Sequence, residues 1–449
     1  METKRQKRRQ LAAPRNWVRG AVLTVSGLFV VVGTASAGTA TLTDVLNQVE
    51  QHAPILKAAD ANADAFKAQK SIARSRFFGG IDAFAHDLHF NDNRLTRPIA
   101  PPVNFSNLTF DDDQFGYGLT AQLPLDLNGR IRYNYKAVSH QANAVQQDAY
   151  NTRLQVLHDA AKLYRGLEEV AGQREALQKQ AEALDGHIKV ATTAIEVGRI
   201  APVEKLRLVA EKKNVEGRLA GLDGVETALR AQLASLMNVP SFDATVPPAK
   251  AIPTPLQFTT EKLRDRPDLK AATERKEAAH AGVIAAKVTY LPEFFATANW
   301  QQNQGYNGAG RDDATWEVMI QARLALWNGG RRRAEIGQAT AQSQAAYYKL
   351  LATQERARAE FAGSNGKWSA GQAQYEAANS ALAAAEEVTR IQTDRFDEGR
   401  LSAADLVDAE ATLERARSGL TTSLVTWWQA DDALRQTVGL PPADYVEAK

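Results

Sequence analysis

The chain has 449 residues, of which 54 are Lys or Arg and 52 are Asp or Glu, and it contains no cysteine. The near balance of charge argues against a nucleic-acid-binding protein, whose surface is strongly basic. The lack of cysteine excludes disulfides, zinc thiolate sites, thiol catalysis and lipid attachment through an N-terminal cysteine.

Residues 1–37 have the three parts of a secretory signal peptide. Seven Lys and Arg residues and one acid, Glu2, occur in this segment, and an apolar or small run at 21–37 ends in the triplet Ala35-Ser36-Ala37. This pattern predicts cleavage after Ala37, with an uncleaved membrane anchor as the alternative. No other apolar run approaches the roughly 20 residues of a spanning helix, so the remainder would have to cross a membrane as strands.

The chain after residue 37 contains two copies of one sequence unit. Gly198 aligns with Gly399 and Gly129 with Gly330, at an offset of 201 residues, whereas Pro54 aligns with Pro267 at an offset of 213. The difference predicts an extra loop in the first copy, which we place at 91–113. The sequence therefore predicts repeat 1 at 38–239, a proline-rich linker at 240–262, repeat 2 at 263–440 and a C-terminal tail at 441–449.

Each repeat opens with a helical stretch, at 54–76 and 267–290, and then changes to a period of two. Apolar side chains occupy every second position from Phe115 to Leu125 and from Trp316 to Leu326. Alternation over about ten residues is typical of a tilted strand with one face in lipid and the other in water. A soluble sheet packed on a helix is the alternative. The predicted strands lie at about 80–91, which alternates less cleanly, 114–125, 293–302 and 315–327.

Aromatic side chains gather near the ends of these strands, as an interfacial girdle requires. They are Phe110, Trp300, Trp316 and Trp327.

A long helical hairpin follows the strands of each repeat, at 129–238 and 330–438. No proline lies between Pro124 and Pro202, or between Pro292 and Pro441, and apolar residues recur at spacings of three and four. The first arm would be on the order of 100 Å long at 1.5 Å per residue. Because one such helix cannot bury itself, we expect the arms to pair. The glycines of the two tips mark the positions where the chain reverses.

This duplicated order resembles the TolC-like outer-membrane factor family. The resemblance is carried by Pro-x-Leu-x-Ala-Ala at Pro54 and Pro267, by Asn-Gly-(Gly)-Arg turns at Asn128 and Asn328, and by two hairpin tips similar to Val-Gly-Leu-Ser. It implies a mainly α fold with membrane β-strands, in which each repeat contributes a helix, a β-hairpin and a long helical hairpin. It also implies a homotrimer that forms a twelve-stranded β-barrel and a periplasmic α-helical tunnel.

The function implied by the resemblance is that of an outer-membrane channel-tunnel in a tripartite efflux or type I secretion system. Such a protein is a passive exit duct in the outer-membrane lipid and uses no cofactor. Its implied partners are a periplasmic adaptor (a membrane fusion protein) and an inner-membrane transporter, with no nucleic acid.

The resemblance also places a gate at the periplasmic tips. It implies that Asp405, Asp408 and Glu204 line an aperture, and that Phe396 stands where some members have a tyrosine contact. Since Asp405 and Asp408 are three residues apart, they share a helix face, and solvated acids at a helix start are the alternative. The expected adaptor contacts are Gly198, Arg199, Ile200, Gly399, Arg400, Leu401 and Ser402.

Two other classes of protein compete with a duct. No nucleophile-elbow, P-loop or His-Glu-x-x-His motif occurs, so we expect no enzyme. A metal site at His86 and His89 is disfavoured, since a spacing of three puts the side chains on opposite faces of a strand. A periplasmic coiled-coil adaptor also carries long helices, but normally in one hairpin. A heat-resistant trimer in outer-membrane extracts would favour the duct.

Overall fold

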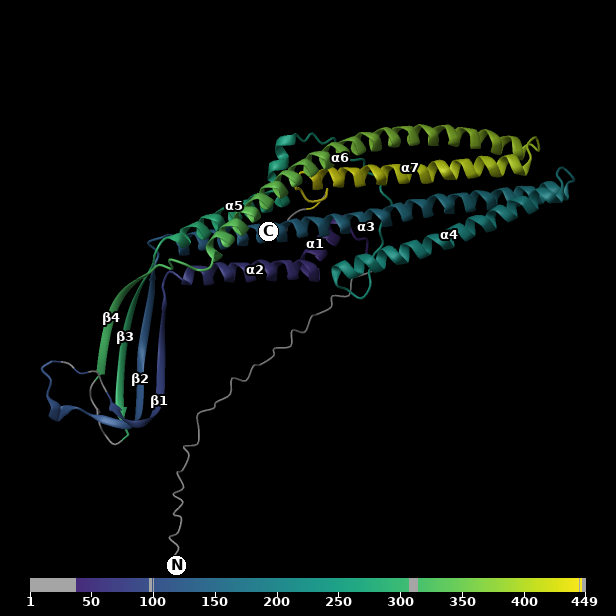
Figure 1. The fold of residues 1–449 in the computed structure, drawn as a ribbon. Helices are drawn as coiled ribbons and strands as arrows, with labels where there is room; N and C mark the ends of the chain where they lie inside the picture. The colour runs from purple at the N-terminus through teal and green to yellow at the C-terminus, as the bar shows by residue number, and fades with distance from the viewer. Residues whose placement is uncertain (1–37, 97–98, 100, 307–313, 444, 446–449) are drawn as a thin grey trace, which may run out of the picture. The chain divides into compact units, whose positions relative to one another are not determined.

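The computed structural model describes residues 38–96, 99, 101–306, 314–443 and 445. The predicted signal peptide at 1–37 therefore lies outside the described residues. Within the described part, no helix combines the length and the apolar character needed to span a membrane. In chain order the helices and strands (Figure 1) are α1 (Leu42–His52), α2 (Pro54–Ser75), β1 (Gly80–Leu95), β2 (Phe110–Leu125), α3 (Arg130–Glu196), α4 (Pro202–Met237), α5 (Pro267–Lys287), β3 (Glu293–Gly305), β4 (Ala314–Arg323), α6 (Arg331–Asp397) and α7 (Ala403–Thr437).

The two repeats have the same order of elements. Helix, two strands and two helices appear as α2-β1-β2-α3-α4 and again as α5-β3-β4-α6-α7. The first arms α3 and α6 are both 67 residues long. Each begins after a glycine with positive φ, 78° at Gly129 and 84° at Gly330, a conformation that glycine adopts without a steric penalty. Proline at the first position of α2, α4 and α5 presets the helical φ.

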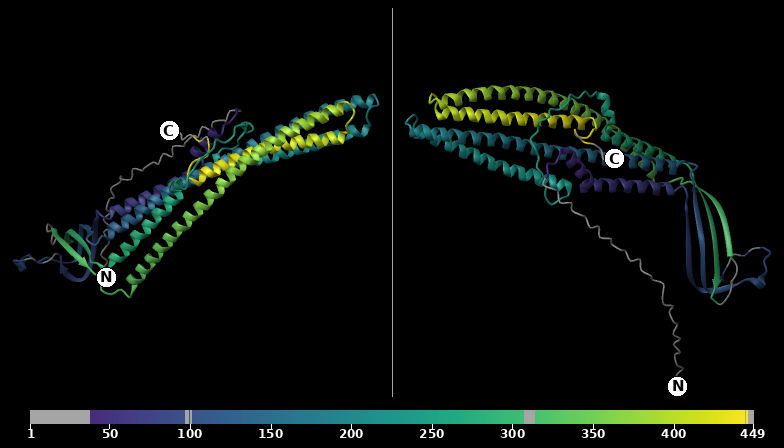
Figure 2. Two further views of the ribbon diagram at one scale, coloured as in Figure 1. Left: turned by 90° about the horizontal axis from the view of Figure 1, so that it is seen from above. Right: turned by 180° about the vertical axis from the view of Figure 1, so that it is seen from behind.

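The four strands form one antiparallel sheet in the order β1-β2-β3-β4. The central ladder joins the two repeats, from Gln114 opposite Gly305 to Leu125 opposite Phe294. The strands lie side by side in two of the three views (Figures 1 and 2). Because β1 and β4 are the outer strands, each leaves one edge without a partner strand among the described residues.

One face of the sheet is apolar and exposed. Directly paired residues point to the same side, and the register aligns Ala83 with Leu119, Leu119 with Trp300, and Trp300 with Trp316. The exposed fraction reaches 76% at Trp316 and 67% at Val318 on β4. An apolar face that is left this open matches a surface that contacts lipid.

On the opposite face, side chains of β1 lie over glycines of β2. Phe84 and His86 stack with ring centroids 5.9 Å apart. A Cβ at Gly118 would come within 2.7 Å of Phe84, and one at Gly116 within 2.4 Å of His86. The glycines therefore make room for these two rings, which explains why β1 alternates less cleanly than its neighbours.

Two predicted boundaries in the strands need correction. The residues predicted as a loop at 91–113 extend the hairpin at both ends of that range, since β1 runs to Leu95 and β2 begins at Phe110, and Arg94 pairs with Asp111 and Leu95 with Phe110. The strand predicted at 315–327 stops at Arg323, which pairs with Glu293, the first residue of β3. Residues beyond Arg323 have no strand to pair with, because Pro292 precedes β3 and carries no N–H.

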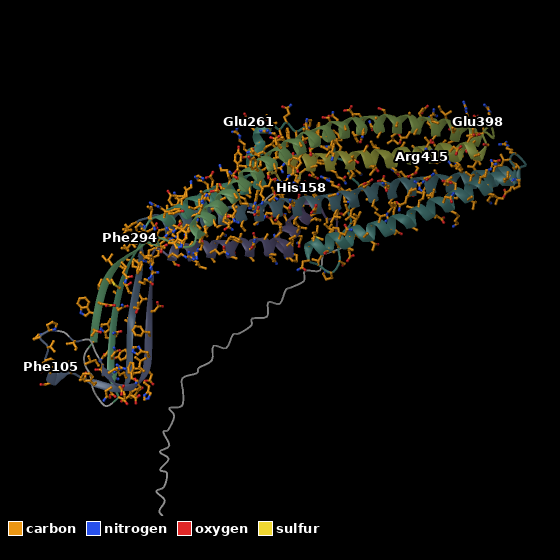
Figure 3. All side chains as sticks on the ribbon, in the orientation of Figure 1. Phe105, His158, Glu261, Phe294, Glu398 and Arg415 are labelled. Carbon is orange, nitrogen blue, oxygen red and sulfur yellow. The ribbon has the colours of Figure 1, made fainter. Side chains whose placement is uncertain are left out.

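The long helix α3 holds the helical part together, since it contacts α1, α2, α4, α5 and α7. Side chains cover the helices along their length (Figure 3). The unpredicted helix α1 buries Leu42, Val45, Leu46 and Val49 against α3, α4 and the segment after α4. Its start was readable in the sequence, because Thr41 and Asp44 form a capping box.

A buried polar group lies where α3 meets α7. His158 donates one hydrogen bond from Nε2 to the Leu440 oxygen, at 2.9 Å. Asp432 accepts the Ala443 N–H at 2.9 Å and lies 4.0 Å from Arg165, whose guanidinium is 4.3 Å from the Trp428 ring centroid. Burial lowers the pKa of His158 to about 4 and raises the pKa of Asp432 to about 6.

These two shifts predict opposite pH dependences. The raised pKa of Asp432 contributes stability below pH 3.8 that is lost as the pH rises through 6, whereas the lowered pKa of His158 contributes stability above pH 6.5 that is lost as the pH falls through 4. We expect the unfolding free energy of Asp432→Asn minus that of the wild type to rise by about 2 kcal/mol from pH 4 to 6.5. For His158→Gln the same difference should fall by about 3 kcal/mol.

Urea unfolding followed by circular dichroism at pH 4, 5 and 6.5 measures both differences. The two variants serve as controls for each other, and slopes of the same sign would contradict the assignment.

Candidate functional site at the hairpin tips

The two hairpin tips have the same backbone geometry. Gly198 and Gly399 adopt positive φ values of 72° and 74°. The N–H of Arg199 bonds the Ala194 oxygen at 2.8 Å, and the N–H of Arg400 bonds the Arg395 oxygen, also at 2.8 Å. This closure requires a left-handed residue, which is why glycine stands at both turns.

The helices that leave the tips are capped differently. At the start of α7, the Ser402 hydroxyl accepts the Asp405 N–H at 3.2 Å and donates to the Asp405 carboxylate at 2.7 Å. The equivalent cap of α4 is Ala201, which has no side-chain acceptor. Asp405 is therefore a partner of the helix cap of α7.

Glu204 joins one tip to the other. Its Oε2 accepts the backbone N–H of Ala403 at 2.8 Å, so an acid from the start of α4 satisfies a free donor at the start of α7. Arg207 lies 3.8 Å from the same carboxylate. In this structure Glu204 therefore fixes the position of the second tip against the first.

The prediction for Phe396 needs correction, because its ring is in the core. Phe396 is 5% exposed and packs among Leu184, Leu208 and Leu406, with its ring centroid 6.1 Å from that of His187. The end of α6 turns this position towards α3 and α4, so the ring does not line an opening. Leu401 packs against the same cluster.

Asp405 and Asp408 are both exposed, on one side of α7. Their carboxylates have no basic partner within the described residues. This arrangement leaves the two acids available to interact with ions or with a neighbouring molecule.

Buried polar links continue along the seam between the hairpins. His187 Nε2 lies 3.0 Å from Glu410 Oε1, and both side chains are buried. Further along, Glu414 is 1% exposed, accepts from Arg218 at 2.7 Å and accepts the Ser418 hydroxyl at 2.7 Å. Two buried acids of α7 thus bind basic side chains from α3 and α4. Burying such pairs is costly unless the geometry is kept, so they fix the register of the hairpins.

The sequence alone does not predict these links. His187, Glu410 and Glu414 lie in charged helical stretches, where a buried acid looks much like an exposed one. The signal that was available is their position beside apolar residues, since Ala409 and Leu413 flank the two acids and are themselves buried.

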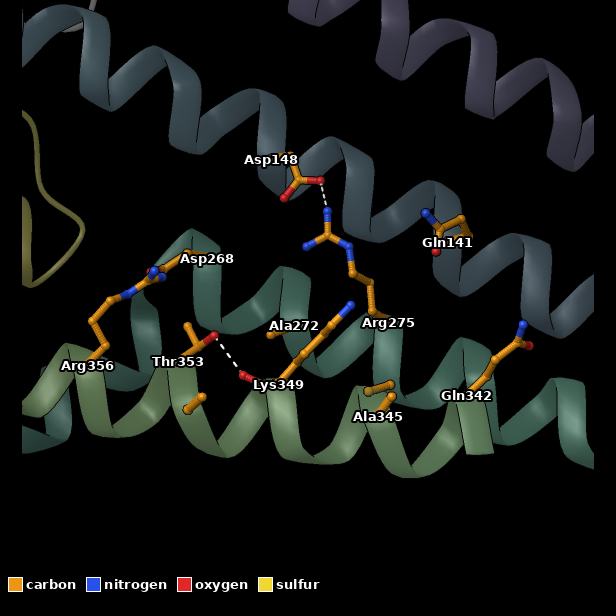
Figure 4. Close-up of a pocket in the computed structure, with 12 residues that line it drawn as sticks. Gln141, Asp148, Asp268, Ala272, Arg275, Gln342, Ala345, Lys349, Thr353 and Arg356 are labelled. Atoms are coloured by element: carbon orange, nitrogen blue, oxygen red, sulfur yellow. Dashed lines mark hydrogen bonds and ion pairs between the residues drawn. The ribbon is translucent and has the colours of Figure 1, made fainter. Parts of the chain in front are cut away.

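A second candidate site is a cleft of about 600 Å³ between α3, α5 and α6. Figure 4 shows its floor of alanines and its charged rim. Arg275 pairs with Asp148 across the cleft, and Arg356 lies 3.7 Å from Asp268. Burial by itself raises the pKa of the Asp268 carboxyl, but hydrogen bonds from Arg266 at 2.9 and 2.8 Å outweigh it and lower the pKa.

No group of three or more metal-binding side chains occurs in the described part of the chain. His89 instead pairs with Asp113 on the neighbouring strand, and His86 stacks on Phe84.

Comparison with known families gives a match over most of the chain. The sequence model of the family described as outer membrane efflux protein matches residues 45–239 and 260–440. The two matched segments correspond to the two structural repeats, and the gap between them falls in the proline-rich linker.

Among curated proteins, the chain is 24% identical over 390 residues to the toluene efflux pump outer membrane protein TtgC of Pseudomonas putida, a match that covers 81% of this chain and 76% of that protein. Among solved structures, it superimposes on the outer membrane protein VceC of Vibrio cholerae with a TM-score of 0.75 and 20% identity, over 89% of this chain and 96% of that one. The CmeC outer membrane channel of Campylobacter jejuni gives a TM-score of 0.75 and 18% identity, over 90% and 87%.

The role of Glu204 at the tips can be tested by hydrogen exchange. Glu204→Ala removes the acceptor of the Ala403 N–H, so we expect exchange at the start of α7 to accelerate about tenfold, the equivalent of one hydrogen bond to a charged group. Glu204→Gln keeps a carbonyl oxygen in place and should remain closer to the wild type. Mass-spectrometric exchange on peptides covering 400–410 measures the effect. Equal protection in both variants and the wild type would show that Glu204 does not stabilise the start of α7.

Proposed function

Because this chain belongs to the outer membrane efflux protein family, we propose that three copies of it close one barrel and one helical tunnel that conduct cargo passively out of the cell. The family match covers both repeats. The protein is an outer-membrane component of efflux machinery, with its long helices in the periplasm. The alternative of a periplasmic adaptor has no support from the family match or from the relatives.

The main support for the proposed trimer is that the sheet of one copy is open at both edges. The outer strands β1 and β4 each have an unpaired edge, and a membrane offers no water to satisfy free N–H and C=O groups. Four strands are too few to close on themselves around a cavity. Pairing β4 of one copy with β1 of the next satisfies both edges, and three copies bring the sheet to the twelve strands of a closed barrel.

Exposed apolar side chains on the helices support the same assembly. Tyr347, Tyr348 and Val388 on α6, and Leu206 and Val225 on α4, are each at least 49% exposed. Large apolar side chains left exposed on a periplasmic surface are typical of contacts with other protein surfaces. We assign those on α6 and α4 to the contacts between neighbouring copies.

Energy for transport would come from other proteins. The family is one of efflux components, and we propose that this chain works as a duct, not as an enzyme. An inner-membrane transporter would supply cargo, and a periplasmic adaptor would dock at the tips. The tip residues are suited to this contact, because Val197, Arg199 and Arg400 are exposed at the two turns.

The gate is proposed at the same end. Threefold repetition of Asp405 and Asp408 would place rings of carboxylates around the axis, as cation-selective pores use. Glu204 and the buried pairs of His187 and Arg218 would hold α7 against the first hairpin in the closed state. Opening would then require α7 to break these contacts.

The closed ring of three copies predicts a defined cross-linking pattern. The chain has no cysteine, so Ile81→Cys on β1 can be combined with a single cysteine on β4, at Val318, Ile320 or Ala322, without background. For at least one pair, we expect oxidation to give covalent dimers and trimers on a non-reducing gel and nothing larger, since a closed ring has no free edge. Ile81→Cys alone is the control. A ladder beyond three, or monomers with every pair, would contradict the ring.

The proposed gate predicts a change in cation block. Asp405→Asn with Asp408→Asn removes both charges but keeps a hydrogen-bond acceptor for Ser402. We expect multivalent cations to block the channel about tenfold more weakly in planar-bilayer recordings, as expected for the loss of about 1.4 kcal/mol of ion binding. Asp60→Asn with Asp64→Asn, on α2, removes the same charge far from the tips and should leave block unchanged. Unchanged block in the tip variant would exclude these acids from the gate.

A further inference from the structure

A row of exposed apolar side chains crosses the end of the sheet where the strands meet the helices. Each of the four strand–helix junctions contributes at least one: Phe78 before β1, Leu127 after β2, Leu291 before β3 and Trp327 after β4, with exposed fractions of 70%, 71%, 49% and 84%. The junctions lie at one end of all four strands, as Figure 1 shows. This row lies between the strands, with their exposed apolar face, and the start of the helices.

Basic side chains lie directly on the helix side of that row. We call the set of Arg76, Arg132, Lys287, Arg331, Arg332 and Arg333 the junction belt. All except Arg332 are exposed. Arg331 pairs with Glu335 at 2.8 Å. No acidic partner of Arg76, Lys287 or Arg333 occurs within the described residues, so the junction belt is positive on balance.

These basic side chains do not stabilise the helices that carry them. The first turns of α3 and α6 contain no acid, although a helix N-terminus favours negative side chains and disfavours positive ones. In repeat 1, Asp126 partly compensates by accepting the Ile131 and Arg132 N–H groups at 2.8 and 3.0 Å. The aligned residue of repeat 2 is the exposed Trp327. Repeat 2 therefore combines three consecutive arginines with an exposed tryptophan, and it has no acid at the position of Asp126.

We propose that the junction belt binds the headgroups of anionic phospholipids in the leaflet that faces the helices. A phosphodiester accepts paired hydrogen bonds from a guanidinium, and clusters of Arg and Lys next to a membrane segment attract anionic lipid. Tryptophan prefers the depth of the headgroups, where Trp327 would lie if the apolar face of the sheet is in hydrocarbon. The apolar row and the junction belt thus match one ligand together. It is a phospholipid with its acyl chains on the sheet and its phosphate on the junction belt.

This inference rests on the sheet crossing the membrane, as proposed above. The two proposals can still fail separately. A protein that conducts ions and cross-links as a closed trimer, but shows no lipid preference, keeps the duct and loses only the lipid site.

The test uses the full assembled protein in detergent, titrated with phosphatidylglycerol or phosphatidylcholine and analysed by native mass spectrometry. We expect the wild type to bind phosphatidylglycerol in preference to phosphatidylcholine. In R331Q/R332Q/R333Q the preference should fall by at least about fivefold, the effect of one basic residue near an anionic surface. R331K/R332K/R333K should retain most of it. The matched control R358Q/R390Q/R395Q removes three exposed arginines elsewhere on α6 and should keep the wild-type preference.

Several results would overturn the proposal. One is an unchanged preference in R331Q/R332Q/R333Q, and another is an equal loss in the control. Displacement of the lipid by millimolar inorganic phosphate would mean that a free anion is the ligand. If the glutamine variant does not assemble, the wild type decides: a preference that disappears as sodium chloride rises to about 0.5 M supports the junction belt, and a preference that persists excludes it.

Discussion

A peptide group in hydrocarbon must be hydrogen-bonded, and this requirement governs the rest of the molecule. The sheet satisfies it along three ladders but leaves one edge of β1 and one edge of β4 open. In the proposed trimer, other copies of the chain would pair with both edges. The helices follow the same requirement, since α3 and α6 leave the sheet at its two halves and carry the arrangement of the strands into the periplasm. The exposed apolar side chains on α4 and α6 would contact neighbouring copies in the proposed trimer.

Much of this architecture could be predicted because the sequence contains two copies of the same unit. The alignment of Gly129 with Gly330 and of Gly198 with Gly399 fixed the ends of the long helices to within a residue or two, since each glycine is needed for a positive φ. The period of two identified the strands, but not their ends. Arg323 ends β4 because β3 has no residue left to pair beyond it, and a ladder between distant segments is not visible in a local pattern.

The site was less predictable, because its residues act through contacts between the repeats. Glu204 is an acid near a helix start in the sequence, and only the fold shows that it reaches the backbone of Ala403 on the other hairpin. Phe396 aligned with a position of known contacts but packs in the core. The buried acids Glu410 and Glu414 carry only a weak sequence signal, since the side of α7 that faces α3 and α4 is decided by the packing of four helices.

The central ladder between β2 and β3 also determines the order in which the protein can be assembled. β2 ends at Leu125 and β3 begins at Glu293, so both helices of the first hairpin must be exported before β2 can meet its neighbour. Until then the first β-hairpin presents an apolar face and an open edge to the periplasm, which is the state most prone to aggregation. Contacts this distant in sequence also form slowly. The first β-hairpin is therefore the part of the sheet that stays exposed longest while the rest of the chain is exported.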